Sequence, residues 1–141
     1  MKYSAAVVDT NVVVAGLLTA EAGSPTIHIL DGMRRGAFRF LISDMLLAEY
    51  RDVLLRAKIR TLHGLSATEV DQLLTEIVTH AIVRAPAPRG GAPDPKDNHL
   101  WALLHAMPGS VLVTGDLALA RKPPPDSQVL SPREFAAEVL G

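Results

Sequence analysis

Four acidic residues of this 141-residue chain, Asp9, Glu49, Asp97 and Asp116, are the ones whose types and positions could carry chemistry together. The chain has no cysteine, and its five histidines show no spacing typical of metal ligands. Carboxylate oxygens without sulfur or imidazole ligands suit Mg²⁺ or Mn²⁺. One or two such ions can polarise a phosphate ester and lower the pKa of the attacking water. Phosphodiester hydrolysis is therefore the chemistry that this set of residues fits best.

Three of these acids, Asp9, Asp97 and Asp116, also have a simpler interpretation as residues that stabilise the beginning of a helix. Asp9 and Asp116 directly follow apolar runs and stand where a helix could begin, which is where aspartate caps helices. Asp94 would be the N-cap of a further helix, with Asp97 in its first turn. Glu49 is harder to explain in this way, because it lies at the margin of the apolar face of its own helix. A partly buried carboxylate there needs a partner, either an arginine or a shared cation.

Four short apolar runs predict buried strands, and the segments between them predict helices. The predicted strands are Ala5–Val8, Phe38–Ile42, Val111–Val113 and Gln128–Leu130. The predicted helices are Val12–Thr19, Pro25–Arg35, Asp44–Ala57, Ser66–His80, Pro95–Ala106 and Pro132–Leu140. The segment Ala85–Pro95 contains four prolines and two glycines, so we expect a loop there.

Strands that alternate with helices predict a parallel sheet of four to five strands with helices on both faces, a three-layer α/β/α sandwich. We expect residues 1–141 to form a single domain of this kind. Right-handed crossovers place the carboxyl ends of parallel strands on the same edge, and ligands bind outside that edge. Asp9 and Asp116 should therefore meet although 107 positions separate them.

Positive charge is concentrated in one part of the chain, although the net charge is −1. Residues 34–60 carry a net charge of +4, which is compatible with a phosphate-binding face beside an acidic pocket and equally with an ordinary solvated surface. The basic residues considered for nucleic-acid binding are Arg34, Arg35, Arg51, Arg56 and Lys58. No apolar run is long enough to span a membrane, and the absence of cysteine is compatible with a reducing compartment, so we expect a cytoplasmic protein.

The order of these segments resembles that of PIN domains. The resemblance rests on Val7–Val12, on the helix start Ser43–Tyr50 with Glu49 inside it, on Asp94–His99 and on Val113–Leu117. The ending Val129–Pro132, followed by Glu134 and Phe135, is also similar. The likeness spans essentially the whole chain and is strongest to bacterial PIN proteins that act as toxins of toxin–antitoxin pairs.

The resemblance implies a Mg²⁺ or Mn²⁺ site, endonucleolytic cleavage of single-stranded RNA, a cognate antitoxin as partner and, as in many relatives, a possible homodimer. Asp9, Glu49, Asp97 and Asp116 match the family's four acids in that order. Four further residues match supporting positions. Asn11 supports the first acid, Thr114 lies beside the fourth, Ser43 is the small hydroxyl near the second-acid helix, and Asp94 is an auxiliary acid. The Pro- and Gly-rich loop before Asp94 departs from the family pattern.

Two other functions compete with this interpretation. A catalytically silent interaction module with the same fold would be expected to lose one or more of the acids, whereas all four are present. A phosphatase with Asp9 as nucleophile usually needs a second acid two residues later, where this chain has Asn11. Such an enzyme also needs a well-placed lysine, which the segment Thr114–Asp116 does not offer.

Overall fold

The computed structural model describes residues 1–124 and 126–141, and its strands are all parallel. The strands are β1 (Ala6–Val8), β2 (Leu41–Ile42), β3 (Ile82–Val83), β4 (Val111–Val113) and β5 (Gln128–Leu130). They pair in the orders β1-β4-β5 and β2-β3, and a parallel bridge between Ala6 and Phe40 links the two groups. The four predicted strand positions are confirmed, with the first shorter by one residue and the second shortened to two residues. Strand β3 was not predicted, because it has two residues and neither side chain is fully buried.

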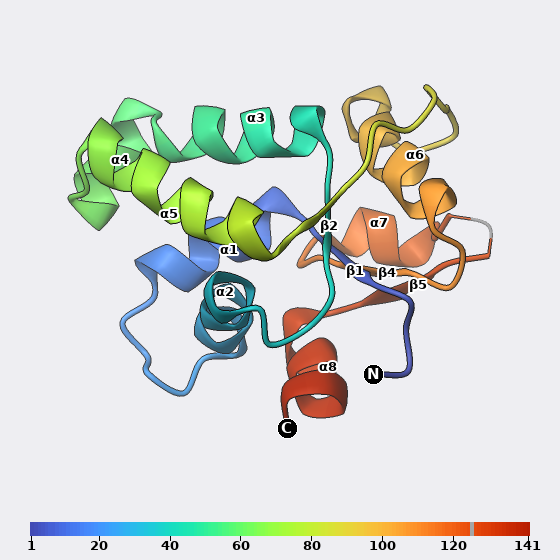
Figure 1. Cartoon of the computed structure of the whole chain (residues 1–141), viewed down its shortest axis with the longest axis horizontal. Coiled ribbons are helices and arrows are strands. Elements are labelled where there is room, and N and C mark those ends of the chain that lie inside the picture. Colours follow the sequence, from blue (N-terminus) through green and yellow to red (C-terminus); the bar gives the residue numbers. More distant parts are fainter. Residues whose placement is uncertain (125) are drawn as a thin grey trace.

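Helices fill the segments between the strands (Figure 1). They are α1 (Thr10–Leu18), α2 (Pro25–Arg35), α3 (Asp44–Leu54), α4 (Ala57–His63), α5 (Ala67–His80), the 3₁₀ turn η1 (Pro95–Asp97), α6 (Asn98–Ala106), α7 (Leu117–Arg121), α8 (Pro132–Phe135) and the π-helical turn η2 (Ala136–Leu140). The helix predicted over Asp44–Ala57 ends early, at Leu54, and α4 begins as a separate helix. Helix α7 was not predicted, because a five-residue helix leaves little periodic signal.

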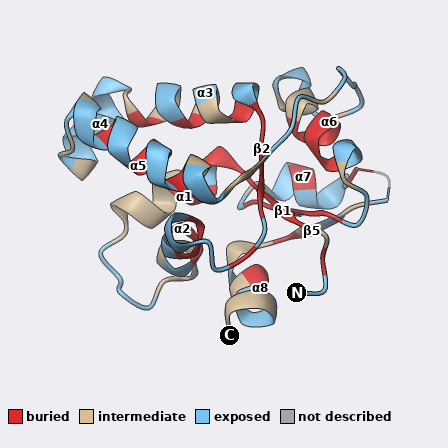
Figure 2. Cartoon of the chain, in the orientation of Figure 1, coloured by how far each residue is buried: buried red, intermediate tan, exposed pale blue. Residues whose placement is uncertain are grey.

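Local sequence signals explain where the clearest helix begins. Ser66 and Glu69 form the predicted capping box of α5, in which each side chain bonds the other residue's backbone N–H at 3.0–3.1 Å. The apolar stripe of α5 is buried against the rest of the molecule, whereas its opposite face is exposed (Figure 2). The helix therefore packs as its periodicity predicts.

The arrangement of layers gives the sheet a switch point between β1 and β4. In Figure 1 the helices α1, α2, α4 and α5 lie to the left of β1, β4 and β5, and α6 and α7 lie above these strands. From β1 the chain continues through α1 and α2 to β2, while β4 pairs with the opposite side of β1. In open parallel sheets, ligands bind at the carboxyl ends of two such strands. Within the described residues, no helix is both long and apolar enough to cross a membrane.

Tyr50 fixes α3 to the carboxyl end of β1. Its side chain is fully buried, and its hydroxyl donates a hydrogen bond to the carbonyl oxygen of Val8. Burial raises the pKa of Tyr50 well above its ordinary value, and the charges of Asp9 and Glu49 act in the same direction. The hydroxyl therefore stays protonated and available as a donor next to the acidic residues.

Replacing Tyr50 by phenylalanine should lower the free energy of unfolding by about 1–2 kcal/mol, because the buried carbonyl of Val8 loses this donor. Chemical denaturation would measure the difference. Tyr3→Phe is the matched control, because the Tyr3 hydroxyl bonds Glu138 and Gln128 in a partly buried setting where water can replace it. An equal or larger loss in the control would contradict the assignment.

Candidate active site

Asp9 is a carboxylate buried at the end of β1, with only 7% of its surface exposed. It is the N-cap of α1, and Oδ1 accepts a hydrogen bond from the backbone N–H of Thr10 at 2.8 Å. Oδ2 accepts two more, from the hydroxyl of Thr114 at 2.8 Å and from the side-chain amide of Asn11 at 3.1 Å. Burial raises the pKa of Asp9, whereas the bonds from Thr114 and Thr10 oppose that rise. Asp9 therefore caps α1 as the sequence predicts, and it also links the end of β1 to Thr114, which follows β4.

Thr114 and Asn11 connect the ends of β1 and β4. The Thr114 hydroxyl donates to Asp9 and accepts from the backbone N–H of Asp116 at 3.0 Å. The Asn11 amide donates to Asp9 and to the Thr114 hydroxyl, and its carbonyl oxygen accepts from the N–H of Gly115 at 3.2 Å. Asn11 and Thr114 therefore both contact Asp9 and link it to the residues that follow β4.

Asp116 and Glu49 approach Asp9 from two different elements. Asp116 caps α7 by accepting from the N–H of Ala118 at 2.8 Å, and its charge helps to raise the pKa of Asp9. Glu49 projects from α3, and its charge also raises the pKa of Asp9. Residues that are 40 and 107 positions away from Asp9 thus act on the same carboxylate.

Glu49 is held by two neighbours that the sequence did not identify as its partners. The hydroxyl of Thr10 donates to Glu49 Oε2 at 2.8 Å, and His99 Nε2 lies 3.3 Å from the same oxygen. The hydrogen bond with His99 is the main reason why the pKa of Glu49 is lowered, although burial opposes it. The sequence alone does not indicate that Thr10 or His99 contacts Glu49. Their proximity to Glu49 depends on how α1, α3 and α6 pack, which no local pattern reveals.

Asp97 carries the strongest sign of crowded negative charge. Burial raises its pKa to about 6, and the charges of Asp9, Asp94 and Glu49 add to the rise. Its side chain makes no capping hydrogen bond to α6. Asp94 is the N-cap of the preceding turn η1, where its side chain accepts from the N–H of Lys96 at 2.9 Å. The Asp97 carboxylate is therefore free to serve another partner.

The structure thus brings Glu49, Asp97 and Asp116 within electrostatic reach of Asp9, without closing the four acids into a metal-binding shell. Across residues 1–124 and 126–141, no three acidic or histidine side chains converge closely enough to hold a metal ion in this arrangement. The Glu49 carboxylate contacts Thr10 and His99. The Asp9 carboxylate contacts Asn11 and Thr114. The donor set of carboxylates and hydroxyls still has the chemistry that Mg²⁺ and Mn²⁺ prefer.

Among the other expected site residues, Arg56 acts on one of the acids, because its charge helps to lower the pKa of Glu49. Ser43 is the N-cap of α3, where its hydroxyl accepts from the N–H of Leu46 at 3.2 Å. Four of the five basic residues considered for RNA binding form surface ion pairs: Arg34 with Glu76, Arg35 with Asp31, Arg51 with Asp71 and Arg56 with Asp52. Exposed pairs of this kind are weak and can exchange partners, but they neutralise much of the predicted basic face.

Asp97→Asn should stabilise the protein at pH 8 by about 1 kcal/mol, a value reduced for the partial solvent exposure of the site. The folded protein binds the Asp97 proton more tightly than the unfolded chain, so parental stability should fall as pH rises from about 4 to about 6. The asparagine variant lacks that loss, and the two should converge below pH 4. Thermal unfolding between pH 3.5 and 8 measures this, with Glu21→Gln in an exposed loop as control. A variant less stable than the parent at pH 8 would refute the account.

Comparison with known proteins agrees with this geometry. The model of the PIN domain family matches residues 5–118, which include all four acids and the strands β1 to β4. No curated protein matches the chain significantly. PIN domains are generally nucleases built on an α/β sandwich with a parallel sheet, which is the fold described above. The chain belongs to the PIN domain family.

Proposed function

We propose that this protein is a metal-dependent endoribonuclease that cleaves single-stranded RNA, with Asp9, Glu49, Asp97 and Asp116 as its metal-binding and catalytic acids. The observation that carries the proposal is that Glu49, Asp97 and Asp116 all lie within electrostatic reach of the buried Asp9, at the β1–β4 switch point. Burial, and with it the charges of neighbouring acids, raises the pKa of Asp9 and of Asp97, and a bound cation would reverse that rise. The family match supports nuclease chemistry in general.

The four acids would divide the work of holding Mg²⁺ or Mn²⁺. Asp9 is fixed in one orientation by three hydrogen bonds and would be the rigid ligand. Glu49 is oriented by Thr10 and His99, and Asp97, which has no capping bond, would be free to turn towards the ion. The chemistry that such a cation supplies is polarisation of the phosphodiester and a lowered pKa of the attacking water.

The supporting residues have roles that follow from their contacts. The Thr114 hydroxyl accepts a hydrogen bond from the backbone N–H of Asp116 and donates one to Asp9. It would therefore hold the acids that follow β1 and β4 at a fixed distance from each other. His99 and Thr10 keep Glu49 ionised and directed at the sheet edge. Asn11 contributes to the same network instead of acting as an acid, so the phosphatase alternative finds no second carboxylate at that position.

Asp9→Asn or Asp116→Asn should reduce Mg²⁺- or Mn²⁺-dependent cleavage of single-stranded RNA by more than the ~10–100-fold that follows loss of a supporting residue. A gel assay on a labelled, unstructured RNA measures the rate. Asp71→Asn is the control, because Asp71 is exposed and paired with Arg51. Circular dichroism should show an intact fold in each variant.

Parental cleavage rates in both Asp9→Asn and Asp116→Asn would overturn the catalytic assignment, as would full activity in EDTA. A well-folded parental chain that cuts no RNA with any divalent ion would favour the silent interaction module instead.

We further propose that the protein is the toxin of a toxin–antitoxin pair in the cytoplasm, bound by a cognate antitoxin and able to form a homodimer. The support for these points is the resemblance in motif order described above. Growth arrest on expression of the parental chain, absent with Asp116→Asn, is the outcome expected of a toxin. Normal growth with abundant, RNA-cleaving protein would contradict that role.

A further inference from the structure

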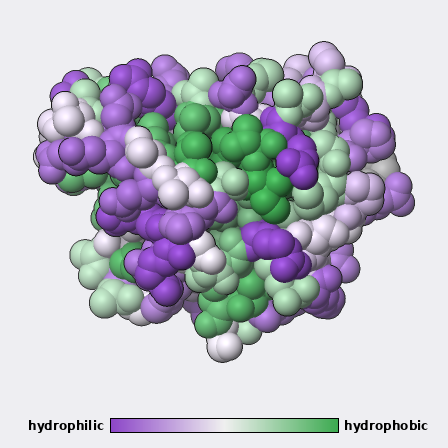
Figure 3. Space-filling model, viewed as in Figure 1, coloured by the Kyte–Doolittle hydropathy of each residue, from purple (hydrophilic) through white to green (hydrophobic). Residues whose placement is uncertain are grey.

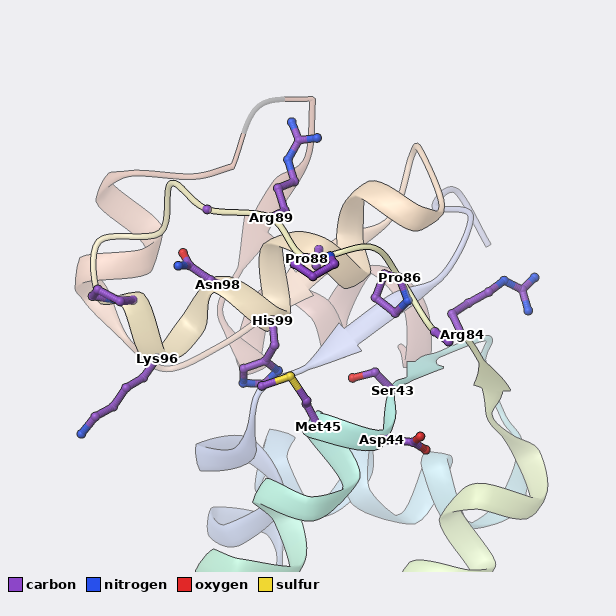
Figure 4. A pocket seen from close by; sticks show the side chains of 14 residues that line it. Ser43, Asp44, Met45, Arg84, Pro86, Pro88, Arg89, Lys96, Asn98 and His99 are labelled. Carbon is purple, nitrogen blue, oxygen red and sulfur yellow. The ribbon is translucent and has the colours of Figure 1, made fainter.

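A pocket of about 660 Å³ lies beside the group of acids and does not include Asp9 or Asp116. Three segments form its walls: the Pro-rich stretch from Arg84 to Gly90, the start of α3 and the start of α6 (Figure 4). The Asn98 side chain accepts a hydrogen bond from the N–H of Ala92 at 3.0 Å, which ties the loop to α6. The pocket touches the acidic site through His99, which lines the pocket and contacts Glu49.

The pocket is lined by cations that have no acidic partner. Arg84, Arg89 and Lys96 stand at the rim of the pocket, and their charged ends point outward from it in three directions (Figure 4). Asp44 is the one acid among the lining residues that the structure describes. In the described part of the chain, none of these three cations has a carboxylate within ion-pair distance. This distinguishes them from the paired arginines of α2 and α3. Uncompensated cations around a cavity are suited to bind phosphate groups.

His99 supplies a buried polar atom that lacks a partner. Its side chain is only 7% exposed, Nε2 faces Glu49, and Nδ1 has no hydrogen-bond partner among the described residues. A neutral imidazole that donates from Nε2 to a carboxylate keeps an acceptor lone pair on Nδ1. A buried acceptor without a donor is costly, so a ligand that presents an O–H or N–H group would satisfy it.

The remaining wall is apolar. Met45, Pro86 and Pro88 line the pocket, and Met45 is 64% exposed. Figure 3 shows apolar atoms gathered over the start of α3 and the segment that follows α5, where Met45 and Val83 are the exposed apolar residues. In Figure 4 the Met45 side chain lies at the His99 ring, and a flexible thioether can move to admit a flat ring.

We propose that this pocket binds one nucleotide of the single-stranded RNA next to the cleaved bond, an inference that rests on the proposed function. Arg84, Arg89 and Lys96 bind the phosphates on either side of that nucleotide. Met45 and the prolines pack against its base, and His99 Nδ1 accepts a hydrogen bond from the ribose 2′-hydroxyl or from an N–H of the base. The volume of the cavity is typical of small-molecule sites. The cations suit the phosphates of a nucleotide, the apolar wall suits its base, and the buried acceptor suits its ribose or a base N–H.

The test is binding of a fluorescent eight-nucleotide RNA to the full chain in EDTA, followed by anisotropy at several salt concentrations. Arg84→Ala/Arg89→Ala should weaken binding about tenfold and reduce the slope of log affinity against log salt by about 1.4, that is ~0.7 for each lost contact with a single strand. Arg60→Ala/Arg133→Ala removes two exposed arginines elsewhere and should change affinity less than twofold. An equal loss in both double variants, or a larger loss in Arg51→Ala/Arg56→Ala, would overturn the pocket assignment.

DNA of the same sequence and RNA with one abasic position identify the donor that reaches His99. If the parental chain binds DNA more weakly than RNA and His99→Phe binds both equally, the donor is the 2′-hydroxyl. The abasic RNA loses the packing against Met45 and the prolines in either protein, so a loss that is larger for the parental chain than for His99→Phe assigns the base. Equal binding of all three strands would overturn the role of His99.

Cleavage by the parental chain is scored separately, so the two proposals can fail independently. Cleavage with unchanged binding in Arg84→Ala/Arg89→Ala refutes the pocket alone. Binding that depends on these arginines, without cleavage under any divalent ion, refutes the nuclease alone.

Discussion

The constraint on which the site depends is a carboxylate buried at the carboxyl end of the central strand. Asp9 is 7% exposed, and its charge is kept there by hydrogen bonds from Thr10, Asn11 and Thr114. Burying such a charge without these bonds would neutralise it. Because Thr114 belongs to the end of β4, the same bonds that retain the charge also set the two central strands against each other. Fold and site are therefore stabilised by one set of contacts.

The packing of α3 and of the turn η1 brings further negative charge close to Asp9. Tyr50 docks α3 on β1, and that docking delivers Glu49, while the 3₁₀ turn η1 delivers Asp97. The molecule tolerates Glu49 because Thr10 and His99 bond it, but it leaves Asp97 with a raised pKa. An arrangement that stores electrostatic repulsion at a ligand-binding edge is typical of functional sites, where stability is given up for chemistry.

The sequence predicts the parts of this site better than the contacts between them. Strand-to-helix junctions mark Asp9 and Asp116, and the parallel topology predicts that they meet, because both are local signals combined with one rule of handedness. Strand β3 and helix α7 were missed, because two and five residues carry too little periodicity. The bond between His99 and Glu49 depends on how α3 and α6 pack. The basic segment also proved to be largely paired with acids. Whether an arginine meets an acid depends on which helix faces lie next to each other, and a count of charges does not show this, as for Arg34, Arg35, Arg51 and Arg56.

The central claim is that these four carboxylates share a divalent cation, although their side chains do not yet form a closed shell in the arrangement described. The most direct measurement is a crystal structure of the protein soaked in Mn²⁺, with anomalous scattering used to locate the ion. The account predicts a strong peak between Asp9, Glu49, Asp97 and Asp116, with carboxylate oxygens about 2.0–2.3 Å from it. Diffraction that shows an ordered site without manganese there, at saturating Mn²⁺, would contradict it.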